Sequence, residues 1–441
     1  MSNGFLLVKD SRTTLEYRVP IQRNSVLATA FKDIKAPSSS GNRADKVGSG
    51  LRVHDPGLLN TTVVETGVTY RDGERDLLLF RGYSLEQLWQ SDYEDMLHLM
   101  VWAKYPTPVQ KESLRRLLIA AMLEVPKNVF EIVSAFPSSS PPMPMIVAGL
   151  AAYLGSNPAM IPASSGGNIY QGNIEKTDKA IINTIAAYAV IVGMAACHRK
   201  GIEFTAPSLD YSFVENLFHM SGMVDDLTGR PDAMKVSCFR RFAALNMDHG
   251  MALAVFSTMV TASSLTDPVS CLIASLAAAY GPLHFGATEA AHLSLRSIGD
   301  KSKVPEFISE VKQGKRKLFG YGHRTYKGTD PRVRPIKELI EDSGANSDPL
   351  IEIAREIERL ASNDDYFTSR GLHPNADFYG NFVFTAVGFH SDFIPIAMIS
   401  QRLIGIMAHW REAMVRGIKL FRPSHIYTGD TEPVYTASAK L

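Results

Sequence analysis

Residues 180–197 read AIINTIAAYAVIVGMAAC, a run without a single charged side chain. The run is barely long enough to cross a bilayer. It contains Asn183 and Thr184 and is rich in alanine, whose small side chain permits close contacts between helices. We therefore expect a core helix that is buried on all sides, and not a membrane span.

Helical character extends over most of the chain. The segments 252–266 and 270–288 are also uncharged, and the remaining long segments show helical periodicity. The Ser- and Gly-rich stretch 36–50 predicts a flexible connector. Strand character is confined to β-branched runs on either side of Asp72-Gly73, which predict one small hairpin. We see no second strand-rich region, so the predicted fold class is mainly α with one small β element near the N-terminus.

Composition is that of an ordinary soluble protein. The chain has 441 residues, of which 45% are hydrophobic and 21% charged, so we expect two domains. The net charge of +1 creates no field that would attract nucleic acid or a membrane surface. Cys197, Cys238 and Cys271 show neither metal nor disulfide spacing, which indicates a reducing compartment and no thiolate metal site.

The two ends of the chain differ in whether they resemble a targeting sequence. The first twenty residues include Asp10 and Glu16, and they resemble neither a secretory signal nor an acid-free transit peptide. The chain ends Ala439-Lys440-Leu441, one small-residue change from the peroxisomal address Ser-Lys-Leu. We expect a peroxisomal protein, with a cytoplasmic location as the alternative if the tripeptide is coincidental.

The first candidate for chemistry is residues 318–335, LFGYGHRTYKGTDPRVRP. Gly320 and Gly322 allow the backbone to approach a ligand closely and to point its amides inward. His323 follows at once, and Arg332 lies nine residues further on. This combination predicts a place where an anionic substrate meets a titratable group.

Three further residues stand in unusual settings. His249 follows an aspartate in AALNMDHGMAL, and His284 precedes a helix-like run in YGPLHFGATEAA. Asp377 lies among apolar and aromatic neighbours in HPNADFYGNFVF, a setting that raises the pKa of a carboxyl group toward a useful basic range. Taken singly, each of these residue types more often has a structural role. A functional assignment therefore depends on their joint pattern.

Five motifs in fixed order resemble citrate synthases: GPLHFGATEAA, LFGYGHRTYKGTDPR, NADFYGNF, SQRLIG and RPSHIYTG. The earlier DPGLLNTTVVETGVTYRDGE and FRGYSLEQL resemble the N-terminal signature of that family. The resemblance runs from Leu51 to Gly429. It implies a two-domain helical fold acting as a homodimer. A large domain would cover 1–286 and 389–441, and a small mobile domain would cover 287–388.

The resemblance also implies a reaction and a role for each motif residue. The reaction is a Claisen-type condensation of an acyl thioester with oxaloacetate, followed by thioester hydrolysis, with no metal or other cofactor. Catalysis would use Asp377 as the base, His284 as a hydrogen-bond donor to the thioester oxygen, and His323 as the group that polarises the ketone. Arginine binds carboxylates bidentately, as such a substrate requires. The implied oxaloacetate-binding residues are His249, Arg332, Arg402 and, from the second subunit, Arg422. The implied CoA-binding residues are Leu318, Phe319, Gly320, Tyr321, Gly322 and Lys327.

Departures from the family pattern indicate which acyl group the enzyme accepts. Citrate synthases commonly read DHE followed by a polar segment such as MNASTFTAR, whereas this chain reads DHGMALAVFSTM, and GPLHGGANEA has become GPLHFGATEA. Each buried methylene of a longer acyl chain could gain about 0.8 kcal/mol in such an apolar setting. We therefore expect an alkylcitrate synthase that uses medium-chain thioesters, similar to those of fungal secondary metabolism. The predicted acyl pocket consists of Ala252, Ala254, Val255, Met259 and Phe285.

Two alternatives remain. One is a citrate or 2-methylcitrate synthase that uses acetyl- or propionyl-CoA. The other is a catalytically inactive homologue that serves as a scaffold, which the retained aspartate, histidines and arginines argue against. The chain has no room for the nucleotide-grasp and phosphohistidine domains of ATP-dependent citrate cleavage. The residues leave open the chain length, the stereochemistry of the product, and whether CoA or a carrier protein delivers the acyl group.

Overall fold

The computed structural model describes residues 4–37, 50–75, 77–323, 325–326 and 328–429. The chain forms two compact units, one of Met1–Glu65 with Arg422–Leu441 and one of Thr66–Phe421. Most of the connector predicted over 36–50 lies outside the described residues, as do Lys327 and the terminal tripeptide.

The first unit contains a β-sheet that the sequence analysis missed. Its antiparallel strands are β1 (Gly4–Lys9), β2 (Glu16–Gln22) and β3 (Ser25–Val26), in that spatial order. Strand β1, GFLLVK, is mostly apolar without alternation, and all its residues except Val8 are exposed. Strand β2 does alternate, with Tyr17, Val19 and Ile21 on its less exposed side. Pro20 lies within β2 opposite Phe5, and proline inside a run argues against a strand. The expectation of a single β element was therefore wrong.

The predicted hairpin is confirmed in the second unit. Strands β4 (Thr69–Asp72) and β5 (Leu77–Phe80) are antiparallel, and the short β6 (Tyr83–Ser84) pairs with β5. The side chain of Asp72 accepts hydrogen bonds from the backbone N–H groups of Glu74 and Arg75, at 3.1 and 3.2 Å. This Asx-type turn reverses the chain where Asp72-Gly73 predicted it.

Helix α6 (Ile174–Lys200) is the buried helix expected from residues 180–197. It begins after the capping side chain of Asn173 and ends at Gly201, which adopts a left-handed φ of 67°. Helix α6 and the segment Ser391–Arg416, which contains α17 (Ile394–Arg416), are long and apolar enough to cross a membrane. However, 89% and 100% of their most apolar windows are buried inside the protein. Tyr188 joins the two helices, since its hydroxyl donates to the Ile396 carbonyl at 2.8 Å.

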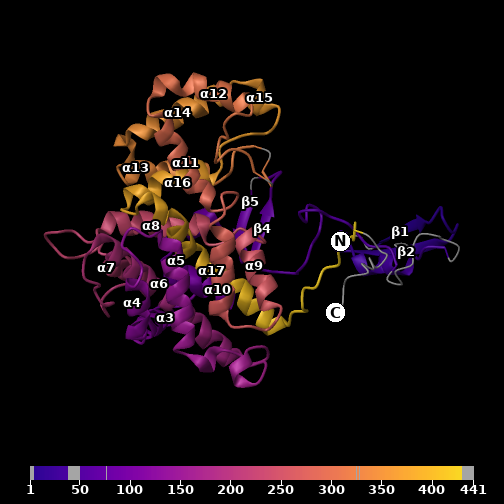
Figure 1. The fold of residues 1–441 in the computed structure, drawn as a ribbon, viewed down its shortest axis with the longest axis horizontal. Coiled ribbons are helices and arrows are strands. Elements are labelled where there is room, and N and C mark those ends of the chain that lie inside the picture. The colour runs from indigo at the N-terminus through magenta and orange to yellow at the C-terminus, as the bar shows by residue number, and fades with distance from the viewer. Residues whose placement is uncertain (1–3, 38–49, 76, 324, 327, 430–441) are drawn as a thin grey trace, which may run out of the picture. The chain divides into compact units, whose positions relative to one another are not determined.

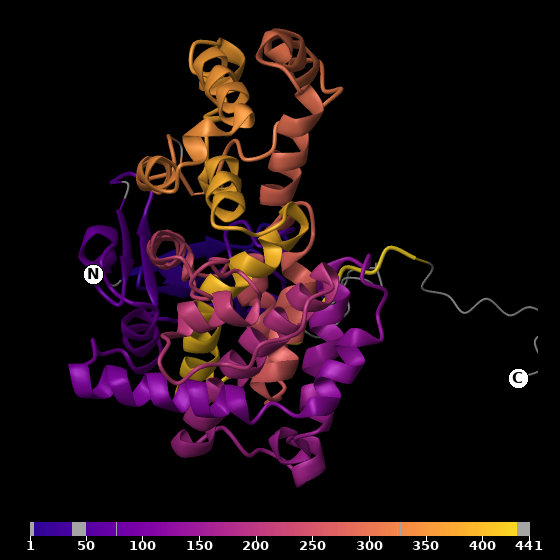
Figure 2. The ribbon, with the colours of Figure 1, turned by 90° about the vertical axis from the view of Figure 1, so that its left-hand side faces the viewer.

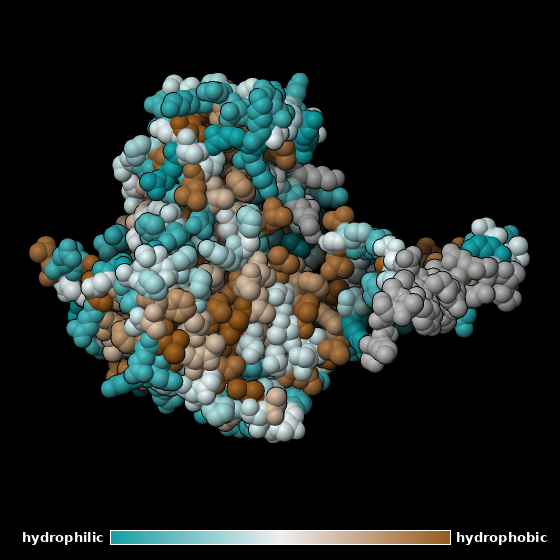
Figure 3. Space-filling model, viewed as in Figure 1, coloured by the Kyte–Doolittle hydropathy of each residue, from teal (hydrophilic) through white to brown (hydrophobic). Residues whose placement is uncertain are grey.

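The other helices pack in two groups. Those up to α10 surround α6 and α17, whereas α11–α16 form a lobe that stands above this body in Figures 1 and 2. The surface of the lobe is mainly hydrophilic, while apolar side chains gather lower on the body over α9 and α10 (Figure 3). The bounds are α1 (Leu85–Leu88), α2 (Tyr93–Trp102), α3 (Pro108–Leu123), α4 (Lys127–Ser134), α5 (Pro142–Gly155), α7 (Phe213–Met220), α8 (Ala233–Asn246), α9 (Leu253–Ala262), α10 (Pro268–Ala279), α11 (Gly286–Ile298), α12 (Val304–Lys312), α13 (Val333–Asp342), α14 (Pro349–Ala361), α15 (Asp365–Thr368) and α16 (Ala376–Ala386).

The lobe of α11–α16 overlaps the range 287–388 predicted for the small domain, a division of the chain that stays a prediction. It begins with α11 at Gly286, and α16 ends two residues before Gly388. The two compact units divide the chain at other positions, because the N-terminal sheet separates from the helices. The mobility of the lobe stays a prediction.

Candidate active site

The glycine loop is held against the start of α16. The N–H of Asn375 donates to the Gly320 carbonyl at 2.8 Å, and the N–H of Gly322 donates to the His373 carbonyl at 2.8 Å. Gly320 has a φ of 78°, and a Cβ there would lie 2.6 Å from Cα of Phe378. The glycines therefore permit close approach to α16. The expectation that the loop amides point toward a ligand was wrong for Gly322, because its N–H is already bonded.

This loop sets the tautomer of His323. The backbone N–H groups of Thr325 and Tyr326 donate to Nδ1 of His323, at 3.0 and 3.3 Å. A neutral ring must then carry its proton on Nε2. Burial, followed by the positive charge of Arg332, lowers the pKa of His323 to about 4. His323 is thus a neutral hydrogen-bond donor near pH 7.

His284 is set in the opposite tautomer. Its Nε2 accepts the N–H of Ala254, in the first turn of α9, at 3.1 Å. The proton of the neutral ring therefore lies on Nδ1. Burial and then the charge of Arg402 lower the pKa of His284 to about 4. The helix N-terminus also favours the neutral ring, because its partial positive charge disfavours an imidazolium.

Asp377 lies in the first turn of α16, where the side chain of Asn375 caps the helix and accepts the N–H of Asp377 at 2.9 Å. Oγ1 of Thr288 donates to Oδ1 of Asp377 at 2.6 Å. Burial raises the pKa of Asp377 above its usual value, while the Thr288 hydrogen bond and Arg332 oppose the rise. A carboxylate with a raised pKa is suited to accept a proton.

Two buried arginines accompany these groups. Arg332 forms an ion pair with Asp330 at 2.6 Å, just before α13. Arg402, on α17, donates through Nε to the Asn246 carbonyl, and no carboxylate in the described part of the chain forms an ion pair with it. Burial lowers the pKa of Arg402 to about 10. A buried cation without a counter-ion favours the binding of an anion.

His249 joins the same cluster. Its ring centre lies 5.1 Å from that of His323, and its Nε2 lies 3.2 Å from the hydroxyl oxygen of Tyr326. Burial, followed by Arg332 and Arg71, lowers the pKa of His249 well below its usual value. Six predicted site residues are thereby brought together: His249, His284, His323, Arg332, Asp377 and Arg402.

The other predicted residues have more varied positions. Arg422 is exposed and belongs to the first compact unit. In the predicted CoA loop, Leu318 and Phe319 are half-buried, and the ring of Tyr321 packs on Phe378 with ring centres 4.9 Å apart. Lys327 lies outside the described residues.

One member of the predicted acyl pocket, Phe285, lies against two residues of this cluster. The Phe285 ring centre lies 4.3 Å from that of His284, and the Arg402 guanidinium lies 5.1 Å above the same ring. The remaining members lie on α9 or at its N-cap; Ala254, Val255 and Met259 are buried, and Ala252 is half-buried. Phe285 therefore places an apolar ring directly beside His284.

Sequence reasoning missed two residues that touch this cluster. Thr288 stands in the GATEAA motif but received no role, although it lies four residues after His284 and bonds Asp377. Arg71, on β4, donates to Nδ1 of His249 at 3.2 Å. Nothing in the local sequence of the hairpin indicates this contact.

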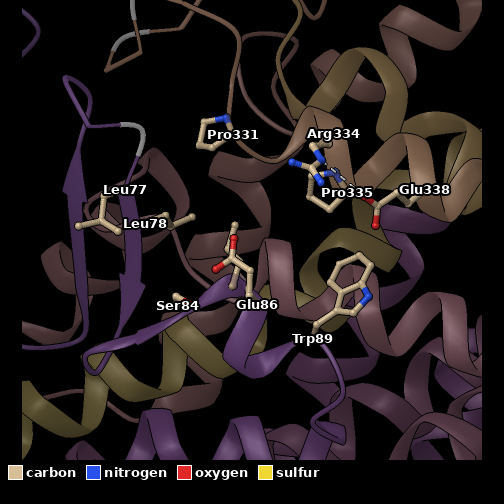
Figure 4. Close-up of a pocket in the computed structure, with 10 residues that line it drawn as sticks. Leu77, Leu78, Ser84, Glu86, Trp89, Pro331, Arg334, Pro335 and Glu338 are labelled. Carbon is tan, nitrogen blue, oxygen red and sulfur yellow. Dashed lines mark ion pairs between the residues drawn. The ribbon is translucent and has the colours of Figure 1, made fainter.

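A separate cavity of about 420 Å³ lies between the hairpin region and α13 (Figure 4). It contains none of the predicted catalytic or substrate-binding side chains. The close-up shows Arg334 and Glu338 of α13 facing Glu86 and Trp89 across it. Its lining residues are Leu77, Leu78, Ser84, Leu85, Glu86, Trp89, Pro331, Arg334, Pro335 and Glu338.

Comparison with known proteins agrees with this geometry. A family model described as "Citrate synthase, C-terminal domain" matches residues 57–424. The alkylcitrate synthase phiJ of Fungal sp. (strain ATCC 74256) is 47% identical over 98% of this chain and 95% of that protein. The alkylcitrate synthase tstJ of Talaromyces stipitatus is 43% identical over 97% and 95%.

A solved structure shows the same fold. It is the citrate synthase of Thermoplasma acidophilum in a ternary complex with carboxymethyl coenzyme A and oxaloacetate. It superposes with a TM-score of 0.78 at 25% identity, covering 87% of this chain and 98% of that one. The family match over most of the chain and the full-length relatives show that this protein belongs to the citrate synthase family.

Proposed function

We propose that this protein is an alkylcitrate synthase that condenses a medium-chain acyl thioester with oxaloacetate and then hydrolyses the thioester. The observation that carries the proposal is the protonation pattern of the site. One carboxylate with a raised pKa lies with two neutral histidines of opposite tautomer, beside buried arginines. The similarity to two alkylcitrate synthases supports the same reaction.

The first step is removal of a proton from the α-carbon of the thioester. Asp377 accepts this proton, and Nδ1–H of His284 donates a hydrogen bond to the thioester oxygen. The negative charge that develops on this oxygen needs such a donor, because the α-proton of a thioester is weakly acidic. A neutral imidazole suffices, and the N–H of Ala254 keeps its proton on the required nitrogen.

The second step forms the carbon–carbon bond. The α-carbon attacks the ketone carbon of oxaloacetate, and the ketone oxygen takes a proton from Nε2 of His323 to become a hydroxyl group. Arg332 and Arg402 bind the carboxylates of oxaloacetate, and His249 contacts the same substrate. Water then attacks the thioester carbonyl of the alkylcitryl intermediate, which releases the free thiol and the new carboxylate.

The apolar residues of the predicted acyl pocket support a medium-chain acyl group. Phe285 lies beside the donor histidine, and α9, whose Ala254 N–H bonds that histidine, carries buried apolar side chains. Each methylene buried there contributes about 0.8 kcal/mol to binding, so affinity rises with chain length until the pocket ends.

A panel of thioesters tests this assignment. Thiol release is measured for acetyl- to decanoyl-CoA with saturating oxaloacetate, and the same acyl groups are offered on a carrier protein. We expect the highest kcat/KM at six carbons or more. An optimum at acetyl or propionyl would instead identify a citrate or 2-methylcitrate synthase. If no thioester releases its thiol, the result would favour the alternative that the protein is a catalytically inactive scaffold.

Assembly and location complete the proposal. The enzyme acts as a homodimer, in which Arg422 of each chain binds oxaloacetate in the site of the other. The exposed position of Arg422 is compatible with this role.

The tail Ala439-Lys440-Leu441 directs the protein to peroxisomes. A fluorescent fusion that leaves the tail free should enter peroxisomes, and deletion of three residues should release it to the cytosol. Cytosolic signal from both fusions would identify the tail as coincidental.

A further inference from the structure

Arg71 extends from the β-hairpin into the cluster of catalytic histidines. Its Nη1 donates to Nδ1 of His249 at 3.2 Å and to Oγ1 of Thr325 at 3.3 Å. The hairpin turn packs on the same loop, because a Cβ at Gly73 would lie 2.6 Å from the Thr325 carbonyl oxygen. Thr325 is two residues from His323. Arg71 is thus held beside both histidines that are assigned to oxaloacetate.

The charge of Arg71 is balanced only in part: the carboxylate of Asp248 acts on it but forms no ion pair with it. Among the described residues, no carboxylate forms an ion pair with Arg71, whereas Arg332 pairs with Asp330 and Arg75 of the same hairpin approaches Asp72 at 3.7 Å. Both of these hydrogen-bond partners of Arg71 are neutral acceptors, and both bonds use Nη1. The side chain is also exposed, so a ligand can reach it.

Nε and Nη2 of Arg71 make no hydrogen bond to the described residues. Arginine binds a carboxylate side-on through Nε–H and one Nη2–H, as two parallel hydrogen bonds. A Cβ at Gly250 would lie 3.4 Å from both Nε and Nη2 of Arg71. The same atom would lie 3.5 Å from Cζ, so a side chain at this position would crowd the Nε–Nη2 side of the guanidinium from above its plane. Glycine leaves that side free and also tolerates the local φ of 63°.

We propose that Arg71 is a further substrate-binding residue, which binds a carboxylate of oxaloacetate through its Nε–Nη2 edge. This proposal rests on the proposed function, because it assigns Arg71 to the oxaloacetate site of that reaction. Arg71 adds to the positive charge supplied by Arg332 and Arg402, and makes the site selective for a dianionic ketoacid. The same positive charge helps to keep His249 and His323 neutral while the site is empty.

Calorimetric titration of the full-length protein with oxaloacetate tests the proposal. We expect Arg71→Gln to weaken binding about ten- to a hundredfold, the range for loss of charge-assisted hydrogen bonds. Arg71→Lys retains the charge without the side-on geometry, and should recover part of the loss. Arg75→Gln is the matched control on the same hairpin, and it should bind as the wild type does. Thermal melting verifies that each variant is folded.

Kinetics separate this role from a structural one. Arg71→Gln should raise the KM for oxaloacetate, while kcat at saturating oxaloacetate and the KM for the thioester stay within about twofold. Unchanged binding of oxaloacetate to Arg71→Gln would overturn the role of Arg71 and leave the reaction assignment intact. So would a reduced kcat without weaker binding, because Arg71 would then position His249. If the wild type itself binds no oxaloacetate, the proposed function fails together with this inference.

Discussion

Replacement of Thr288 by valine should change the pH dependence of the enzyme in a defined direction. The Thr288 hydroxyl donates to Oδ1 of Asp377 at 2.6 Å, and this bond favours the charged carboxylate. Its loss raises the pKa of Asp377 further, and the base is active only above that pKa. A hydrogen bond to a charged group contributes about 1.5–3 kcal/mol, and about 1.4 kcal/mol corresponds to a tenfold change. The acidic limb of kcat/KM should therefore move to higher pH by about one to two pH units.

The assay is thiol release over a series of pH values, with the best thioester and varied oxaloacetate. Below the limb, Thr288→Val should be about ten- to a hundredfold slower than the wild type, and at high pH it should approach the wild-type rate. Thr288→Ser retains the hydroxyl and is the control, with a limb at the wild-type position. A valine variant slowed by the same factor at every pH would refute the reasoning, since the hydroxyl would then not act through the protonation of Asp377.

Asp377→Asn should lower kcat by about 10²- to 10⁴-fold with unchanged thermal melting; near-normal turnover in an uncontaminated preparation would exclude Asp377 as the base. Mixing inactive Arg422→Ala subunits with inactive Asp377→Asn subunits should restore part of the activity through hybrid dimers, whereas proven subunit exchange without recovery would contradict a crossing arginine. Gly320→Ala places a Cβ 2.6 Å from Cα of Phe378 at a left-handed φ, so it should lower the melting temperature and the activity. Gly328→Ala, where nothing lies within 4 Å of the added atom, is its control, and equal losses in both variants would argue against the clash.

The sequence predicted those parts of the molecule that local pattern or ordered motifs encode. The uncharged run 180–197 predicted α6, and the turn residues at Asp72-Gly73 predicted the hairpin. The motif resemblance assigned roles to six residues that the structure brings together, although they come from segments far apart in the chain. Long-range pairing of this kind cannot be derived from periodicity, so only the order of the motifs revealed it.

The missed features depend on contacts without a local signal. Arg71 and His249 are 178 positions apart, and Thr288 and Asp377 are 89 apart. Neither pair has a spacing that a helix or strand repeat would select. The N-terminal sheet was missed for a different reason, because β1 shows no apolar-polar alternation and Pro20 interrupts the alternation of β2.

The hydrogen bond from Ala254 to His284 has a consequence for how this enzyme could diversify. The donor is a backbone N–H, so every residue at position 254 except proline supplies it. The side chains of α9, including Val255 and Met259, can then change in size without altering the tautomer on which enolisation depends. Substrate range can drift through mutation while the chemical step is preserved. Lineages of such enzymes can explore new acyl chain lengths with few inactive intermediates.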